Sequence, residues 1–127
     1  MIQSPVKLVL FTQTIGAPET AFIARQVLDE IAGLNDHVTV EEANVVLDRE
    51  RAAQYGIEHI PSIVLLAGDD DARMRFMGAP AGYEFMSLIE AVVLAGTTGS
   101  GLAPENQALI ASYVTTPLDL QVFVTPT

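Results

Sequence analysis

Short apolar segments typical of β-strands alternate along this chain with longer segments whose apolar residues recur at helical spacing. Strand patterns occur at residues 6–11, 37–43, 62–66 and 73–77, and helical patterns at residues 18–33, 49–55 and 85–93. This alternation predicts an α/β domain of order β-α-β-α-β-β-α. A further helix is expected at about residues 102–114, followed by a strand at 118–124.

The predicted helices carry apolar stripes. A proline and an acid at Pro18 and Glu19 favour a helix start, and Gly33 favours its end. The first helix is expected to bury Phe22, Ile23, Val27, Leu28 and Ile31. The helix near the C-terminus is expected to turn Leu109, Ile110 and either Tyr113 or Val114 inward. We expect the strands at 6–11 and 63–66, which are almost wholly apolar, to pack centrally between the two long helices.

The charge of the chain excludes whole classes of partner. Six Lys and Arg residues stand against 16 Asp and Glu residues, which gives a net charge of −10. Nucleic acids and anionic membranes bind clustered positive charge, so neither is an expected partner. The longest apolar runs have only five residues, whereas a membrane span needs about twenty. No secretory signal pattern is visible at the N-terminus, so the sequence predicts a cytoplasmic protein.

The chain contains no cysteine. This excludes disulfides, thiol catalysis, iron–sulfur clusters and cysteine-ligated zinc. Two histidines, His37 and His59, do not suffice for a histidine-rich metal site. The sequence therefore predicts neither a metal nor another cofactor.

Three ordered segments resemble a known family. Residues 55–62 (YGIEHIPS) resemble the thioredoxin-type segment in which a proline precedes the third strand. Residues 75–85 (RFMGAPAGYEF) and 122–127 (VFVTPT) resemble segments of the tandem-thioredoxin protein disulfide oxidoreductases, the glutaredoxin-like proteins. The N-terminal domain of the alkyl hydroperoxide reductase flavoprotein subunit is similar in layout. The resemblance implies a thioredoxin-like fold with a cis peptide bond before Pro61, beside which an extended peptide or a thiol would bind.

The same resemblance indicates where the family carries its C-x-x-C motif. One register places those two cysteines at Pro18 and Ala21, and the alternative register places them at Ala17 and Thr20. Neither register has a thiol here. Without a thiolate there is no nucleophile for disulfide exchange, so the unit is expected to be redox-inactive and not an enzyme by itself.

These observations lead to one preferred function and one alternative. Residues 1–97 are expected to form a thioredoxin-like domain, and residues 98–127 a linker helix and the first strand of a second thioredoxin-like unit. The preferred function is a structural, partner-docking half of a thiol–disulfide oxidoreductase system. The alternative is a stand-alone module that binds a peptide or small thiol noncovalently through His59, Ile60 and Pro61. The expected partner is another protein or a second thioredoxin-like unit, and the apolar segment 118–124 favours a homodimer.

Overall fold

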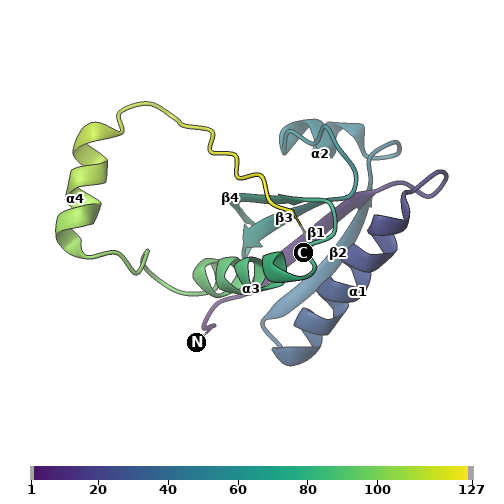
Figure 1. The fold of residues 1–127 in the computed structure, drawn as a ribbon, viewed down its shortest axis with the longest axis horizontal. Coiled ribbons are helices and arrows are strands. Elements are labelled where there is room, and N and C mark those ends of the chain that lie inside the picture. The colour runs from purple at the N-terminus through teal and green to yellow at the C-terminus, as the bar shows by residue number, and fades with distance from the viewer. Residues whose placement is uncertain (1, 126–127) are drawn as a thin grey trace.

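The computed structural model describes residues 2–125 and contains a four-stranded sheet flanked by helices (Figure 1). The strands are β1 (Val6–Thr12), β2 (Val38–Asn44), β3 (Ser62–Ala67) and β4 (Asp70–Met77). The helices are α1 (Glu19–Leu34), α2 (Arg49–Gln54), α3 (Tyr83–Ala95) and α4 (Pro104–Tyr113). Through α3 the order is β-α-β-α-β-β-α, which confirms the predicted α/β class. The last two residues of the 122–127 segment lie outside the described residues.

The sheet has the strand order β2-β1-β3-β4. β1 runs parallel to β2 and antiparallel to β3, and β4 runs antiparallel to β3. The two strands with the most continuous apolar sequences, β1 and β3, therefore occupy the centre, where nearly all of their side chains are buried.

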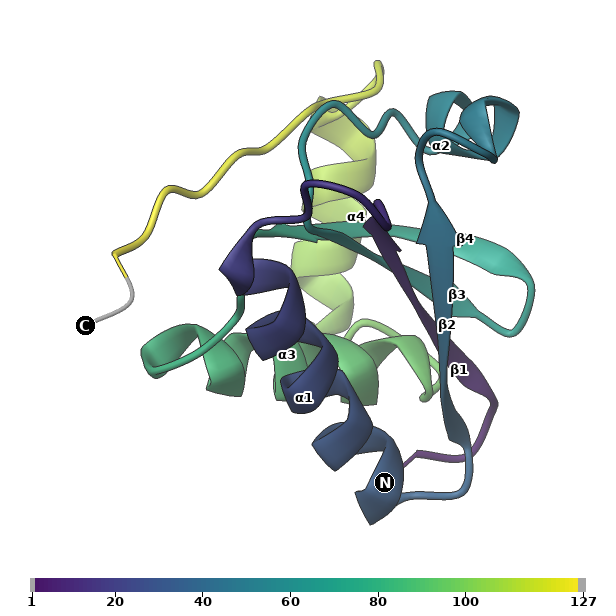
Figure 2. The ribbon, with the colours of Figure 1, turned by 90° about the vertical axis from the view of Figure 1, so that its right-hand side faces the viewer.

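The two long helices cover the same face of the sheet, as Figure 2 shows. Leu8 and Leu10 of β1 pack there in one cluster with Leu28 of α1 and Leu88 of α3. The prediction that the central strands lie between the two long helices is therefore wrong. Side chains alternate along a strand, so the remaining residues of β1 face the other way and need a different cover.

The opposite face of the sheet is covered by α2 and by charged side chains. Val9 and Phe11 of β1 pack there with Ala52 of α2. Above them, Arg51 forms an ion pair with Glu41, and the ammonium of Lys7 lies 3.8 Å from the same carboxylate. A six-residue helix is too short to cover this face, so the long stems of the basic side chains help to exclude water.

The N-terminal segment closes the unit against the end of α3. The amides of Gln3 and Ser4 donate to the carbonyl of Gly96, at 2.8 and 3.1 Å. A Cβ at Gly96 would lie 2.6 Å from Cγ2 of Ile2, so this close approach requires glycine.

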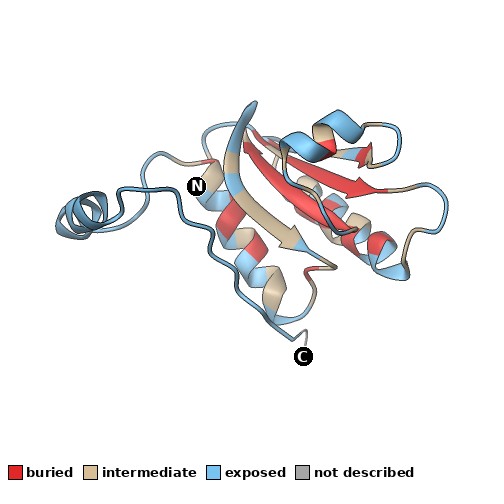
Figure 3. Ribbon diagram, turned by 90° about the horizontal axis from the view of Figure 1, so that it is seen from above, coloured by how far each residue is buried: buried red, intermediate tan, exposed pale blue. Residues whose placement is uncertain are grey.

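Residues 98–125, which we call the C-terminal arm, contribute nothing to the core. Every residue of the arm is exposed (Figure 3). The predicted helix is present as α4, but the expected inward positions Leu109, Ile110, Tyr113 and Val114 are all exposed. The predicted strand at 118–124 is wrong, because these residues form no strand in the structure. A strand requires a hydrogen-bonded neighbour, and within residues 2–125 none pairs with this segment.

Among the described residues, no helix has the length and apolar character needed to cross a membrane.

Candidate functional site

Several loops and helix starts meet at one end of the sheet, which we call the Pro61 end. Phe11 of β1 pairs with Ser62 of β3, and Ser62 pairs with Met77 of β4. The loops that follow β1 and β4 and the loop that precedes β3 therefore lie at the same end of the sheet. The loops after β1 and β4 lead directly into α1 and α3. The fold thus brings the chain around Pro61 to the start of α1.

Pro61 is a fixed part of this end. Its side chain is buried and the Ile60–Pro61 peptide bond is cis. The amide of Gly78 donates to the carbonyl of Pro61 at 2.8 Å, and the hydroxyl of Ser62 donates to the carbonyl of His59 at 2.6 Å. These two bonds tie the loop to the start of β3 and to the loop after β4, so its backbone is held in one arrangement.

Ile60 leaves its backbone polar groups available. Within residues 2–125, no backbone hydrogen bond uses the amide or the carbonyl of Ile60. The Ile60 residue as a whole is half-buried, and the neighbouring His59 is exposed. Because each backbone group normally takes one strong partner, this residue can pair with an extended segment of another molecule.

The start of α1 contains the positions that lack cysteine. Pro18 caps the helix in an extended conformation, and the amide of Ala21 donates to the carbonyl of Pro18 at 2.9 Å. Pro18 is half-buried and Ala21 is buried, whereas in the alternative register Ala17 is half-buried and Thr20 is exposed. Neither pair holds a thiol, and a thiolate is the group that attacks a disulfide in thiol–disulfide exchange.

Phe22 is a residue that the sequence interpretation misplaced. It was expected in the buried stripe of the first helix, but its side chain is 72% exposed in the first turn of α1. The residues that face the sheet from this part of the helix are Ala21 and Ala24. Since α1 begins at the Pro61 end, Phe22 presents an aromatic surface there. The spacing of Ala21, Ala24, Leu28 and Ile31 is the signal that could have revealed this.

The polar groups of the Pro61 end are mostly acidic or uncharged. Glu19 lies in the first turn of α1, and Glu84 lies in the first turn of α3. Burial raises the pKa of the Glu84 carboxyl above its usual value. The hydroxyl of Thr12, at the end of β1, is buried and has no hydrogen-bond partner within the described residues. The ionisable side chains of Glu19 and Glu84 are both carboxyl groups at helix starts, which favours an uncharged extended chain over an anion.

Neither a metal centre nor a nucleophilic site accompanies these residues. Across residues 2–125, no three His, Asp or Glu side chains come together in a way that could hold a metal ion. The arrangement can therefore bind through backbone pairing and apolar contact.

Comparisons with known proteins agree with this geometry. No protein-family model matches the chain. A thioredoxin of Methanocaldococcus jannaschii is 37% identical over 90 residues, which cover 70% of this chain and 94% of that protein. A probable thioredoxin of Methanothermobacter thermautotrophicus is 32% identical over 68 residues, which cover 53% of this chain and 74% of that protein.

Solved structures share the fold over most of the chain. The N-terminal NTD_N/C domain of alkylhydroperoxide reductase AhpF from Enterococcus faecalis superposes with a TM-score of 0.74 and 30% identity. That match covers 87% of this chain and 53% of the AhpF domain, so the chain spans about half of that structure. A protein disulfide oxidoreductase from Aeropyrum pernix superposes with a TM-score of 0.67 at 20% identity, over 87% of this chain and 48% of that one.

The fold, the arrangement at Pro61 and the near-complete coverage of a thioredoxin lead to one conclusion: the chain belongs to the thioredoxin family, as a member whose sequence contains no cysteine.

Proposed function

We propose that the chain is a redox-inactive thioredoxin-fold unit that docks an extended segment of a protein partner in a thiol–disulfide oxidoreductase system. The observation that carries this proposal is the unpaired backbone of Ile60 beside Pro61, in a chain without a thiol. The backbone groups of Ile60 can still pair with a bound segment, although the chain has no nucleophilic thiol. The role that remains is to hold a partner noncovalently.

The physical basis is strand-like pairing. An extended peptide beside Ile60 would accept a hydrogen bond from its amide and donate one to its carbonyl. Such bonds add little affinity unless apolar contacts accompany them, because water satisfies the same groups in the free state. The exposed ring of Phe22 at the same end of the sheet supplies an apolar contact.

A titration followed by amide NMR tests the docking role. The probe is insulin B chain with its cysteines carboxymethylated, which is an unfolded polypeptide without free thiols. We expect shift changes confined to the amides of Ile60, Ser62 and Phe22 and their neighbours. Shifts spread over the whole surface, or none at millimolar peptide, would overturn the proposal.

Two matched variants make this test specific to the Pro61 end. Phe22→Ser removes the aromatic contact, and Leu34→Ser removes an equally exposed apolar side chain at the far end of the same helix. We expect the first variant to weaken peptide binding about tenfold or less, because one exposed contact is lost. The second variant should bind like the unmodified chain.

A small-thiol binding module is the second candidate, because the same resemblance implies a thiol or a peptide at this loop. Titration with reduced glutathione separates the two. Shifts at Ile60 and His59 with glutathione, without shifts from the peptide, would favour the small-thiol module over the docking role.

The proposal also includes the absence of reductase activity. In an insulin-reduction assay with dithiothreitol, we expect the chain to leave the uncatalysed rate unchanged, since it has no thiolate to form a mixed disulfide.

A cytoplasmic location is part of the same proposal, and cell fractionation tests it.

A further inference from the structure

The last described part of the C-terminal arm lies beside the start of α3. The two segments share one pocket, which is lined by Tyr83, Glu84, Ser87, Phe123, Val124 and Thr125. In Figure 1 and in Figure 2 the yellow end of the arm passes the N-terminal end of α3. Two parts of the chain that are far apart in sequence are therefore neighbours here.

The start of α3 belongs to the Pro61 end of the sheet. The amide of Gly78 donates to the carbonyl of Pro61 at 2.8 Å, and α3 begins shortly afterwards, at Tyr83. Pro80, in the loop between them, is fully buried, so this loop is packed in place. A segment that contacts the start of α3 is therefore close to the surface that the proposed function uses.

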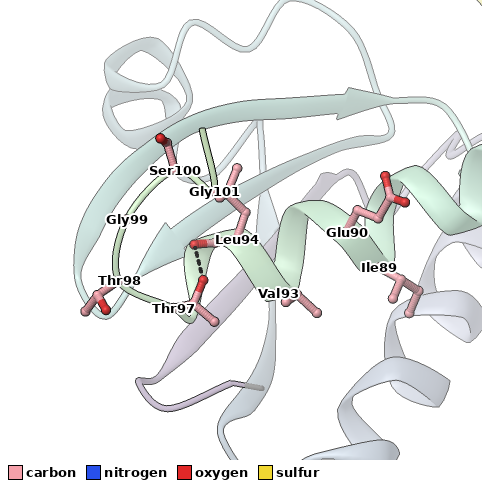
Figure 4. Close-up of a pocket in the computed structure, with 9 residues that line it drawn as sticks. All are labelled: Ile89, Glu90, Val93, Leu94, Thr97, Thr98, Gly99, Ser100 and Gly101. Carbon is pink, nitrogen blue, oxygen red and sulfur yellow. Dashed lines mark hydrogen bonds between the residues drawn. The ribbon is translucent and has the colours of Figure 1, made fainter. Parts of the chain in front are cut away.

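The base of the arm is held at the opposite end of α3. The hydroxyl of Thr97 donates to the carbonyl of Leu94 at 3.4 Å, and the linker as far as Gly101 bends around this end of the helix (Figure 4). Gly99 has a φ angle of 86°, which residues with a side chain rarely adopt. The arm thus leaves α3 through a turn that its backbone specifies.

The arm is long enough to connect the two ends of α3 with slack. The 13 residues of α3 span about 20 Å. The ten residues of α4 contribute about 15 Å on the same scale, and the nonhelical residues 114–122 can add up to about 30 Å. Phe123 can therefore move toward or away from the start of α3 while both helices stay intact.

Residues 115–125, which we call the strap, have the chemistry that the Pro61 end favours. The strap contains one charged residue, Asp119, among alternating large apolar residues. Within residues 2–125, no backbone hydrogen bond uses its amides or carbonyls, and those of Ile60 are likewise unpaired. Extended segments whose backbone groups are free can pair with each other. The strap is therefore a ligand of the same kind as the extended partner proposed above.

The strap is only partly engaged in the structure. Phe123 is 89% exposed and Val124 is 55% exposed, while the pocket that they line has a volume of about 520 Å³. This space is larger than one aromatic side chain, so Phe123 has room to move into it. Burial of the ring is favourable, and closure costs less entropy than the binding of a free peptide, because the strap is tethered.

We propose that the strap is an intramolecular competitor of the docked partner. Phe123 and Val124 close onto the start of α3, and the adjoining extended backbone then covers Ile60. This inference rests on the proposed function, because it concerns the same end of the sheet. A tethered segment acts at an effective concentration of roughly millimolar, so contacts too weak to bind a free peptide can keep the strap closed. A partner docks only when its affinity suffices to displace the strap.

A spin label tests the closure without any partner. Because the chain has no cysteine, Gln121→Cys gives a single attachment site for a nitroxide within the strap and keeps Phe123 and Val124. We expect the nitroxide to broaden the amide signals of Tyr83 and Ile60. Broadening that reaches Tyr83 but not Ile60, or neither, overturns the proposal.

A mixed sample identifies which chain supplies the strap. An isotope-labelled chain without the nitroxide is combined with a nitroxide-carrying chain without the isotope. We expect the amide signal of Ile60 to stay sharp, because the strap acts within its own chain. Broadening of this signal would mean that another copy supplies the strap, and the intramolecular closure would be wrong.

The affinity for carboxymethylated insulin B chain measures the competition. Phe123→Ser should weaken the closed state, so the peptide should bind about threefold to tenfold more tightly, as expected for a strap that is closed roughly two-thirds to nine-tenths of the time. Leu109→Ser is the matched control, because Leu109 is an exposed apolar residue of α4 outside the pocket. This control should bind like the unmodified chain.

The same titration separates the failure of the strap from the failure of the docking role. Equal peptide affinity of Phe123→Ser and the unmodified chain, both of them binding, contradicts the strap and leaves the docking role in place. If neither chain binds the peptide at millimolar concentration, the docking role is wrong, and the competition is wrong with it.

Discussion

At the scale of single residues, Glu41 shows how charge contributes to the α2 face of the sheet. Its carboxylate accepts hydrogen bonds from the guanidinium of Arg51, and these bonds lower the pKa of Glu41 below its usual value. A lowered carboxyl pKa stabilises the folded state above the unfolded pKa, and this contribution disappears as the pH falls through the folded pKa. The side chain is 39% exposed, so solvent screens the pair.

For Glu41→Gln we therefore expect a loss of less than about 1 kcal/mol in the free energy of unfolding at pH 7. The loss should shrink at acidic pH, as the pH falls through the lowered pKa of Glu41 and its carboxyl is protonated in the unmodified chain as well. Urea unfolding at pH 7 and at acidic pH measures the difference. Glu50→Gln on the exposed side of α2 is the control and should show no such dependence. An equal loss at both pH values would contradict the ion-pair explanation.

Glu84 is expected to act with the opposite sign. Burial at the start of α3 raises its pKa, so the charged form is unfavourable in the folded state. The folded chain gains stability from this residue as the pH falls through the folded pKa, and loses it again as the pH rises. Glu84→Gln should therefore stabilise the chain at pH 7, by less than about 1 kcal/mol, and should be neutral near pH 3. Thermal unfolding over that range tests the sign, and destabilisation at pH 7 would contradict it.

Phe22 shows why residue orientation was harder to predict than helix position. The apolar residues of α1 fit two overlapping stripes, and counting the large side chains selects the stripe with Phe22 and Ile23. In the structure the small residues Ala21 and Ala24 face the sheet, with Leu28 and Ile31 further along. A helix that rests on alanines can approach the sheet closely. Depth of packing is a tertiary property, so periodicity alone did not determine which stripe is buried.

At the scale of elements, the sheet, the three helices of the domain and the helix of the arm were predictable from local pattern, but the strand expected at 118–124 was wrong. Leu118, Leu120, Val122 and Val124 alternate with other residues as in a strand. Alternation expresses a preference for extended backbone, but a strand also requires a partner that supplies a ladder of hydrogen bonds. No sequence pattern states whether that partner is present. Likewise, whether the backbone amide and carbonyl of Ile60 stay unpaired depends on which loops contact this residue. The importance of Pro61, by contrast, could be anticipated from the resemblance of its segment to the thioredoxin-type segment.

The start of α1 gives a prediction about the missing C-x-x-C. The hydrogen bond from the Ala21 amide to the Pro18 carbonyl closes a turn between these two residues, so thiols placed there would lie within reach of each other. The helix N-terminus would also lower the pKa of the first thiol. We expect Pro18→Cys/Ala21→Cys to catalyse insulin reduction roughly tenfold or more above the unmodified chain. Ala17→Cys/Thr20→Cys, with its second thiol exposed, should be much weaker, and the reverse ranking would favour the other register.

At the scale of the whole molecule, the chain divides into a packed domain and an arm that is exposed throughout its described residues. The core strands β1 and β3 are almost fully buried, whereas every residue from 98 to 125 is exposed. Amides of β1 and β3 should therefore exchange with solvent only through global unfolding, at a rate that does not change with protein concentration. Nothing in the described residues of a single copy gives α4 comparable protection.

The difference between the domain and the arm can be tested by measuring hydrogen exchange at two protein concentrations. If association with a second copy orders α4, its amides are protected at tens of micromolar and lose that protection when the chain is diluted well below the dissociation constant of that association. Protection of β1 should stay constant over the same dilution, which makes the sheet an internal control. Mass spectrometry of peptides from residues 104–113 and 6–12 reads both signals in one sample. Protection of α4 that does not change on dilution would mean that the helix is stable without a second copy, because only association depends on concentration.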